Sequence, residues 1–473
     1  MANKDQYFET EEFKANLRSY EEALQAGRSV YFDSDIFADI AEYYQSRGQK
    51  EQAAEAIERA IRLFPGATLP WVFKAREALM AENGVEEAYE CLQHVDDTSD
   101  FEYIYMLAEI MIVEDKIEQA DAVLQACFDT LDDDERNDFL VDAATLYADY
   151  EVFDKALQWF EQINGGEDSE YKELKGRISL GHGNYEESEN IFQELLEEDP
   201  YSSHYWNNLA SLQFLKNDFA NAITSSEFSI AINPDDSEAI LNKGNSLFSL
   251  GNYDEALKYF RRYAELVPDD ATGEMLKGVT LLHLNRTDEA LARFKAAERK
   301  CGTASANLPE IYQEMAFTYS RLGQMEKALA YVDKRSALKY DYPAETLLLK
   351  GHILLENDDV ESAQEAFQEA VRLSDNSPEI FLQIAISVYD CGYLQLAYKL
   401  LLSYFEGVNN DTDDGYSYLA ICCKELGKTD EYMQAVKKAC EKNPAEARMV
   451  LVDLFPQEMD PADYYAYLLS NGA

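Results

Sequence analysis

The sequence has few cysteines, and none of them forms the paired CxxC motif of a zinc site. There are seven cysteines in 473 residues, odd in number and mostly isolated, which is unlike the dense framework of a secreted disulfide-rich domain. We therefore expect reduced, mostly buried thiols and a cytoplasmic location. The seven are Cys91, Cys127, Cys301, Cys391, Cys422, Cys423 and Cys440.

Long apolar runs are also missing. No apolar stretch approaches the ~18 to 20 residues that a membrane span requires. The amino-terminal residues lack a basic segment followed by an apolar one, so we expect no export signal. These two absences predict that the chain is neither exported nor anchored in a membrane.

Basic residues are scarce relative to acidic ones. Lys and Arg number 41 against 91 for Asp and Glu, which gives a formal net charge of −50. Such a charge repels nucleic acid phosphates and anionic lipids, so neither nucleic acid nor a membrane is expected as a partner. The acidic surface has two interpretations: we favour a solubilising role, and the alternative is a surface that binds basic partners.

Catalytic and metal-binding motifs are absent as well. The five histidines have no HExxH or HxH spacing, and no serine lies in a GxSxG context. The segment from Gly181 to Asn184 lacks the glycines and the GKS or GKT ending of a phosphate-binding loop, so we interpret it as a turn between helices. We expect no metal, no cofactor, no small-molecule substrate and no enzymatic activity.

What the sequence does contain is an internal repeat. Pro200, Pro234 and Pro268 are each separated by 34 residues. The segments that end at these prolines contain two stretches of helical length with apolar residues at 3.6-residue spacing, separated by a short turn. A period of this length is typical of a solenoid of helix pairs.

A small residue recurs in the first helix of each unit, at intervals of 32 to 38 residues. The twelve small residues are Ala41, Ala75, Ala108, Ala144, Gly176, Ala210, Gly244, Gly278, Ala316, Gly351, Ala385 and Ala420. Twelve residues later, or thirteen in the second unit, come Ala53, Ala88, Ala120, Ala156, Ser188, Ala222, Ala256, Ala290, Ala328, Ala363, Ala397 and Tyr432. Two antiparallel helices approach closely only where both lack bulk, so we expect these positions to face each other within each unit.

Together these residues resemble the tetratricopeptide repeat (TPR) family between residues 34 and about 444. The pattern is carried by Trp206, Leu209, Ala210, Phe219, Ala222, Pro234, Tyr253, Ala256, Phe260 and Pro268. The resemblance implies an all-α fold, a right-handed superhelical α-solenoid of about twelve helix-turn-helix repeats with helical caps. The fourth unit is short, the stretch from Ser305 to Pro309 forms a longer loop, and Tyr432 stands where a small residue is expected.

We predict three regions along the chain. Residues 1–33 form an amino-terminal capping helix, with Phe13, Leu17, Tyr20 and Leu24 on one face. Residues 34–444 form twelve tandem units that start near 34, 68, 101, 137, 169, 203, 237, 271, 309, 344, 378 and 413. Residues 445–473 form carboxy-terminal capping helices.

Five lysines directly precede the small residue of a first helix. They are Lys74, Lys175, Lys243, Lys277 and Lys350. We expect their stems to pack beside the helix crossing while the ammonium groups reach water or a neighbouring carboxylate. The alternative is a basic ladder that binds a partner.

The family resemblance implies a concave channel lined by the first helices. Residues that project toward it are mostly carboxylates near the two ends of the chain, and neutral or amide-rich in the middle. Amides can pair with a peptide backbone as donor and acceptor, and phenylalanines offer apolar contact. The predicted peptide groove consists of Asn207, Asn208, Ser211, Phe214, Asn242, Asn245 and Phe248.

We therefore predict a non-catalytic scaffold or adaptor that binds a protein or peptide in this channel. The alternative is a chaperone-like or regulatory binder that sequesters a basic or unfolded client. Salt-sensitive binding would favour the second interpretation.

Overall fold

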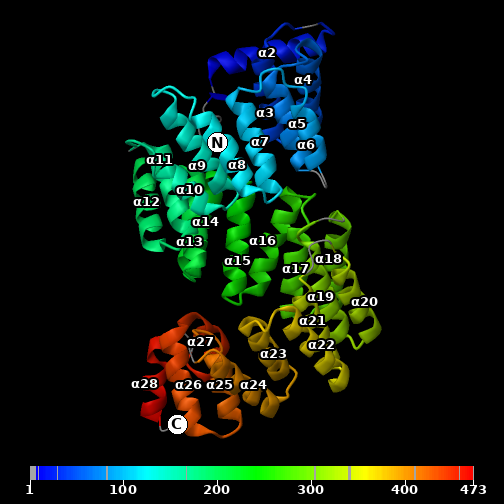
Figure 1. Ribbon diagram of the computed structural model, residues 1–473, viewed down its shortest axis with the longest axis vertical. Helices are drawn as coiled ribbons and strands as arrows, with labels where there is room; N and C mark the ends of the chain where they lie inside the picture. Colours follow the sequence, from blue (N-terminus) through cyan, green and yellow to red (C-terminus); the bar gives the residue numbers. More distant parts are fainter. Residues whose placement is uncertain are drawn as a thin grey trace. The chain divides into compact units, whose positions relative to one another are not determined.

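The computed structural model describes residues 7–8, 10–28, 30–80, 84–166, 168–302, 305–338, 342–409, 412–456 and 459–471. Within these ranges the regular structure consists of α-helices, which Figure 1 shows, and one short 3-10 helix, Val452–Leu454. None of these helices is long and apolar enough to cross a membrane. The predicted all-α class is confirmed.

The chain divides into two compact units, Met1–Leu212 and Gln213–Ala473, and each is described by itself. Unit 1 contains α2 (Glu11–Gln25), α3 (Ser34–Ser46), α4 (Lys50–Leu63), α5 (Thr68–Leu79), α6 (Val85–Leu92), α7 (Phe101–Val113), α8 (Ile117–Phe128), α9 (Arg136–Asp149), α10 (Phe153–Phe160), α11 (Ser169–Gly181) and α12 (Tyr185–Glu198). Helix α13 (Ser203–Leu215) contains the point of division.

Unit 2 continues with further helices of similar length. They are α14 (Phe219–Ile232), α15 (Ser237–Ser249), α16 (Tyr253–Leu266), α17 (Thr272–His283), α18 (Thr287–Lys300), α19 (Leu308–Arg321), α20 (Met325–Ser336), α21 (Pro343–Glu356), α22 (Val360–Leu373), α23 (Pro378–Asp390), α24 (Leu394–Gly407), α25 (Tyr416–Glu425), α26 (Thr429–Lys442), α27 (Pro444–Leu451) and α28 (Pro461–Asn471).

Helices that follow one another along the chain pack in pairs. In unit 1 the pairs are α3 with α4, α5 with α6, α7 with α8, α9 with α10 and α11 with α12. In unit 2 they are α15 with α16, α17 with α18, α19 with α20, α21 with α22, α23 with α24 and α25 with α26. The first helix of a pair also contacts the first helix of the next, as α3 does with α5 and α21 with α23. Each helix therefore buries its apolar side against neighbours that are close in sequence.

Short polar residues begin and end these helices. Asp33, Asp168 and Asp236 cap helix N-termini, each accepting a hydrogen bond from a backbone N–H at 2.9 to 3.1 Å. The turn inside a pair contains a residue in the left-handed region, such as Gly251 with a φ of 75° and Asn285 with a φ of 57°. This conformation stops the first helix and reverses the chain direction.

The small residues of the first helices make room for rings from the second helices. A Cβ atom at Gly244 would lie 2.6 Å from the ring of Phe260, and one at Gly278 would lie 2.5 Å from the ring of Phe294. The expectation was that the two small residues of a unit face each other. In the structure a third residue also packs at this helix crossing. The side chain nearest to each of these two glycines is a phenylalanine four residues beyond the second small position.

Helices at both ends cover the adjoining pairs. In unit 1, Phe13 and Tyr20 of α2 are almost fully buried in one apolar cluster with Phe37 of α3. In unit 2, α27 and α28 both pack on α26, and Phe455 stacks on Tyr464 with ring centroids 3.9 Å apart. These contacts cover apolar surface that the terminal pairs would otherwise expose.

Candidate functional site

The predicted peptide groove is divided between the two units. Asn207, Asn208 and Ser211 lie on α13 in unit 1. Four further residues belong to unit 2: Phe214 on α13, and Asn242, Asn245 and Phe248 on α15. Whether the two sets act together stays a prediction.

The predicted groove residues differ in accessibility. Asn207 has only 4% of its surface exposed, so it offers a partner almost no contact area. The other six side chains are half-buried. The Asn208 amide donates to the carbonyl of His204 at 3.0 Å, within its own helix. Burial of a helical side chain depends on its neighbours in three dimensions, which helical spacing alone does not specify.

Phe248 has a packing role in unit 2. Its ring meets the ring of His283 edge-on at 5.0 Å between centroids and that of Tyr253 at 5.2 Å. Tyr253 in turn stacks on His283 at 4.7 Å. Burial lowers the pKa of His283, and so does the nearby charge of Arg321. Phe248 therefore packs against His283, a residue for which the sequence indicated no binding role.

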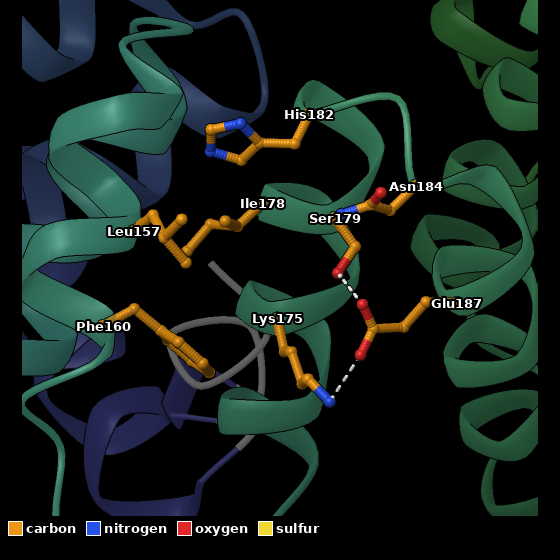
Figure 2. Close-up of a pocket in the computed structure, with 8 residues that line it drawn as sticks. All are labelled: Leu157, Phe160, Lys175, Ile178, Ser179, His182, Asn184 and Glu187. Carbon is orange, nitrogen blue, oxygen red and sulfur yellow. Dashed lines mark hydrogen bonds and ion pairs between the residues drawn. The ribbon is translucent and has the colours of Figure 1, made fainter.

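A first cavity, which we call the neutral cavity, lies in unit 1 between α10, α11 and α12. Its volume is about 400 Å³. Figure 2 shows Leu157 and Phe160 on one side, with Ile178 pointing toward Leu157, and Lys175, Ser179, Asn184 and Glu187 on the other side. The lining residues are Leu157, Phe160, Lys175, Ile178, Ser179, His182, Asn184 and Glu187.

The charges in the neutral cavity are paired. Glu187 forms an ion pair with Lys175 at 2.7 Å and accepts a hydrogen bond from the Ser179 hydroxyl at 3.1 Å (Figure 2). These two donors, Lys175 first, hold the pKa of the Glu187 carboxyl below its ordinary value. One carboxylate and one ammonium face this cavity, so its polar side is close to neutral.

A second cavity, which we call the acidic cavity, lies in unit 1 between α4, α5 and α6. Its volume is about 570 Å³. The lining residues are Ala54, Glu58, Trp71, Lys74, Glu77, Ala78, Glu87, Glu90, Cys91 and His94. Four carboxylates therefore face one ammonium group and a tryptophan. The Trp71 indole stacks on His94 with centroids 4.3 Å apart and donates to the carbonyl of Pro65 at 2.7 Å.

The carboxylates of the acidic cavity differ from Glu187 in their partners. Within the part of the chain that the structure describes, no ion pair within 4.0 Å joins Glu58, Glu77, Glu87 or Glu90 to a basic side chain. Burial raises the pKa of the half-buried Glu77 carboxyl, and the more distant charges of Lys74 and Lys50 only partly offset this effect. The cavity consequently holds negative charge that nearby side chains do not neutralise.

The two cavities occupy equivalent places in their repeats. Both lie between two successive second helices, above the first helix that separates them. Relative to the small residues, Ala54 corresponds to Leu157, Lys74 to Lys175, Glu77 to Ile178, Ala78 to Ser179, and Glu87 to Glu187. The signal in the sequence is Glu77, two residues after Ala75, where the equivalent residue of the neutral cavity is Ile178.

The lysines before the small residues have structural partners. Lys175 pairs with Glu187 at 2.7 Å, Lys243 with Glu227 at 2.7 Å and Lys277 with Glu274 at 2.8 Å. The Lys243 ammonium also lies 4.5 Å from the centre of the Tyr259 ring. At these three positions the structural interpretation is confirmed, and a basic ladder is not formed.

The described residues contain no group of three or more His, Cys, Asp and Glu side chains that could hold a metal ion. His204 pairs with Glu173 at 2.8 Å.

All seven cysteines are free. Cys91, Cys422 and Cys423 are buried and the other four are half-buried, which is fewer buried thiols than expected. Burial raises the pKa of Cys422 to about 12 and that of Cys423 to about 11, so both thiols are protonated at neutral pH.

Comparison with known families gives tetratricopeptide repeat matches in both units. One tetratricopeptide repeat model matches residues 174–236 and 241–305, and a second matches 34–66, 309–334 and 344–377. No curated protein matches the sequence.

Solved structures with similar folds include the APC/C hetero-tetramer Cut9-Hcn1, at 15% identity over 96% of this chain and 95% of that one, with a TM-score of 0.37. MamA from Desulfovibrio magneticus RS-1, from residue 41 onward, is 16% identical over 36% of this chain and 93% of its own, with a TM-score of 0.33. MamA from AMB-1 is 23% identical over 35% and 95%, with a TM-score of 0.31. None of these likenesses is close enough to suggest a partner for this chain.

Proposed function

Because this chain is a tetratricopeptide repeat protein, we propose that it is a non-catalytic scaffold or adaptor that binds a protein or peptide partner through its first helices. Repeats of this family typically mediate interactions between proteins. The observation that supports the site most directly is Asn245 on α15. Its half-buried amide has no hydrogen-bond partner among the described residues. A half-buried amide of this kind can donate to and accept from a peptide backbone.

The proposed site within unit 2 consists of Asn242, Asn245 and Phe248. Asn242 and Asn245 are three residues apart on α15, so their side chains lie on the same side of the helix. Both are half-buried, as is Phe248, which supplies apolar surface beside them. Asn207, predicted as a member of the groove, is too deeply buried to be the first choice for a test.

The test is capture of partners from an extract of the source cell by the full chain, followed by mass spectrometry. The variant is Asn242→Ala with Asn245→Ala, and the matched control is Thr224→Ala, an exposed residue of the adjoining second helix α14. Helicity and melting temperature are measured for each variant. We expect specific partners to be lost from the double variant and retained by the control. Unchanged capture by a folded double variant would contradict the site.

The net charge of −50 favours a second candidate function, a chaperone-like or regulatory binder that sequesters a basic or unfolded client. Such binding should weaken steeply as ionic strength rises, because screening acts on exposed charges. Capture of partners that is retained at high salt would favour the groove, and capture that is lost at high salt would favour the client binder.

We place either activity in the cytoplasm, since seven unpaired thiols suit a reducing compartment.

A further inference from the structure

We propose that the acidic cavity of unit 1 is a socket for an arginine side chain from a basic segment of a protein partner. This proposal rests on the proposed function, because the arginine would belong to a protein partner that the chain binds. It concerns a different surface, however, because the cavity lies between the second helices α4 and α6 and shares no residue with the proposed groove on α15.

The first argument is the uncompensated charge of the cavity. Glu58 reaches it from α4, Glu77 from α5, and Glu87 and Glu90 from α6, while Lys74 is the one basic residue other than a histidine in its lining. Glu77 is half-buried and the other three carboxylates are exposed. A half-buried carboxylate such as Glu77 without a cationic partner is unfavourable, and an incoming cation would stabilise it. The carboxylates that line the cavity come from three different helices, α4, α5 and α6.

The second argument is the aromatic wall. The Trp71 ring lines the cavity and is held in place by its stacking on His94 and by its hydrogen bond to the Pro65 carbonyl. A planar guanidinium packs well against an indole while its N–H groups remain directed at carboxylates. The ammonium of a lysine lacks this planar fit, which is why we assign an arginine.

The third argument is the comparison with the neutral cavity, which the same arrangement of helices forms three repeats further along the chain. There Ile178 and Ser179 occupy the places of Glu77 and Ala78, and Glu187 is paired with Lys175. The repeat therefore packs without an acidic residue at the position of Glu77. A general excess of exposed acid does not account for Glu77 either, since that side chain is half-buried.

The test is isothermal titration calorimetry of the full chain with a short, acetylated and amidated peptide of alternating glycine and arginine. Two further peptides replace each arginine by citrulline, which has the same shape without the charge, or by lysine. We expect the arginine peptide to bind, the citrulline peptide not to bind, and the lysine peptide to bind more weakly by about threefold because the stacking on Trp71 is reduced. Equal affinity for arginine and citrulline would overturn the proposal.

Variants locate the binding. The double variant Glu77→Gln with Glu87→Gln should bind the arginine peptide more weakly, with a dissociation constant about tenfold higher. The control, Glu51→Gln with Glu86→Gln, removes the same charge from exposed residues of α4 and α6 that do not line the cavity, and should change affinity less than about twofold. Equal losses in both pairs would show that the peptide binds the acidic surface at large, against the proposal.

A third variant, Glu77→Ile, reproduces the wall of the neutral cavity and should also weaken binding, with helicity and melting temperature retained. If it does not fold, the glutamine pair decides the question alone. Asn242→Ala with Asn245→Ala should leave binding of the arginine peptide unchanged, so the groove and the socket succeed or fail separately.

Discussion

The hydroxyl of Ser188 donates a hydrogen bond of 2.8 Å to the backbone carbonyl of Gly176, twelve residues earlier in the chain. Both residues are buried. The contact joins the small residue of α11 to the small residue of α12, so in this unit the two positions do face each other across the helix crossing. Ten of the twelve units have alanine at the position of Ser188.

We expect the crossing at Ser188 to tolerate alanine and to reject bulk. Ser188→Ala removes a buried hydroxyl together with its hydrogen bond, so the free energy of unfolding should change by less than about 1 kcal/mol. Ser188→Val forces extra methyl groups into the crossing and should cost about 2 kcal/mol. Urea denaturation followed by circular dichroism measures both variants. Equal stability of the two would mean that the crossing is not tightly packed.

Glycine in the first helix goes together with phenylalanine in the second. Each of the four glycines has a phenylalanine four residues beyond the second small position: Gly176 with Phe192, Gly244 with Phe260, Gly278 with Phe294, and Gly351 with Phe367. Seven of the eight alanines have a smaller residue there. The exception is Ala144 with Phe160, whose ring stacks on Tyr171 at 4.6 Å between centroids.

This relationship predicts a compensating pair of substitutions in unit 2. Gly278→Ala places a Cβ atom 2.5 Å from the Phe294 ring and should destabilise the protein by about 2 kcal/mol. Phe294→Leu alone should cost about 1 kcal/mol or more through lost packing. The double variant should be more stable than the sum of these costs predicts, by at least about 1 kcal/mol. Strict additivity of the two losses would contradict the pairing.

Much of the fold could be predicted from the sequence because its contacts are local. Small residues recur at a nearly constant interval, and each helix packs on neighbours close in the chain. In the unit predicted to start near residue 413, the first helix, α25, begins at Tyr416, because the preceding Gly415 has a φ of 90°, outside the α-helical region.

The sites were harder to predict, for a physical reason. The exposure of Asn207 depends on side chains from neighbouring helices, which cover it, whereas its helical position alone suggested a surface residue. The acidic cavity combines residues from α4, α5 and α6, which the fold brings together from separate parts of the sequence. Charge counts along the chain cannot show which carboxylates lack partners.

Arg335 is a buried cation with incomplete hydrogen bonding. It is 4% exposed, and its guanidinium donates to Glu345 at 3.0 Å, while its Nε and Nη1 atoms have no partner within the described residues. Because a poorly satisfied buried charge is costly, Arg335→Met should leave the melting temperature unchanged or raise it. Glu345→Ala should lower it, since the arginine then loses its partner. A large loss of stability in the methionine variant would mean that the guanidinium is fully satisfied in solution.

Glu314 should make the stability of unit 2 depend on pH. Burial, reinforced by the charge of Glu310, raises the pKa of this carboxyl from 4.5 to about 7. A carboxyl whose pKa is raised by folding binds its proton more tightly in the folded state, so its contribution to stability is fully present below about pH 4.5 and is lost as pH rises through about 7.

The variant Glu314→Gln keeps the neutral form at every pH and removes this loss. Its melting temperature should match that of the unmodified chain near pH 4 and exceed it increasingly as the pH rises toward 8, because only the unmodified chain must then bury a carboxylate. Glu326→Gln, an exposed residue of α20, provides the control and should show no such divergence. Melting curves by circular dichroism across this range test the prediction, and parallel curves for Glu314→Gln and the unmodified chain would refute it.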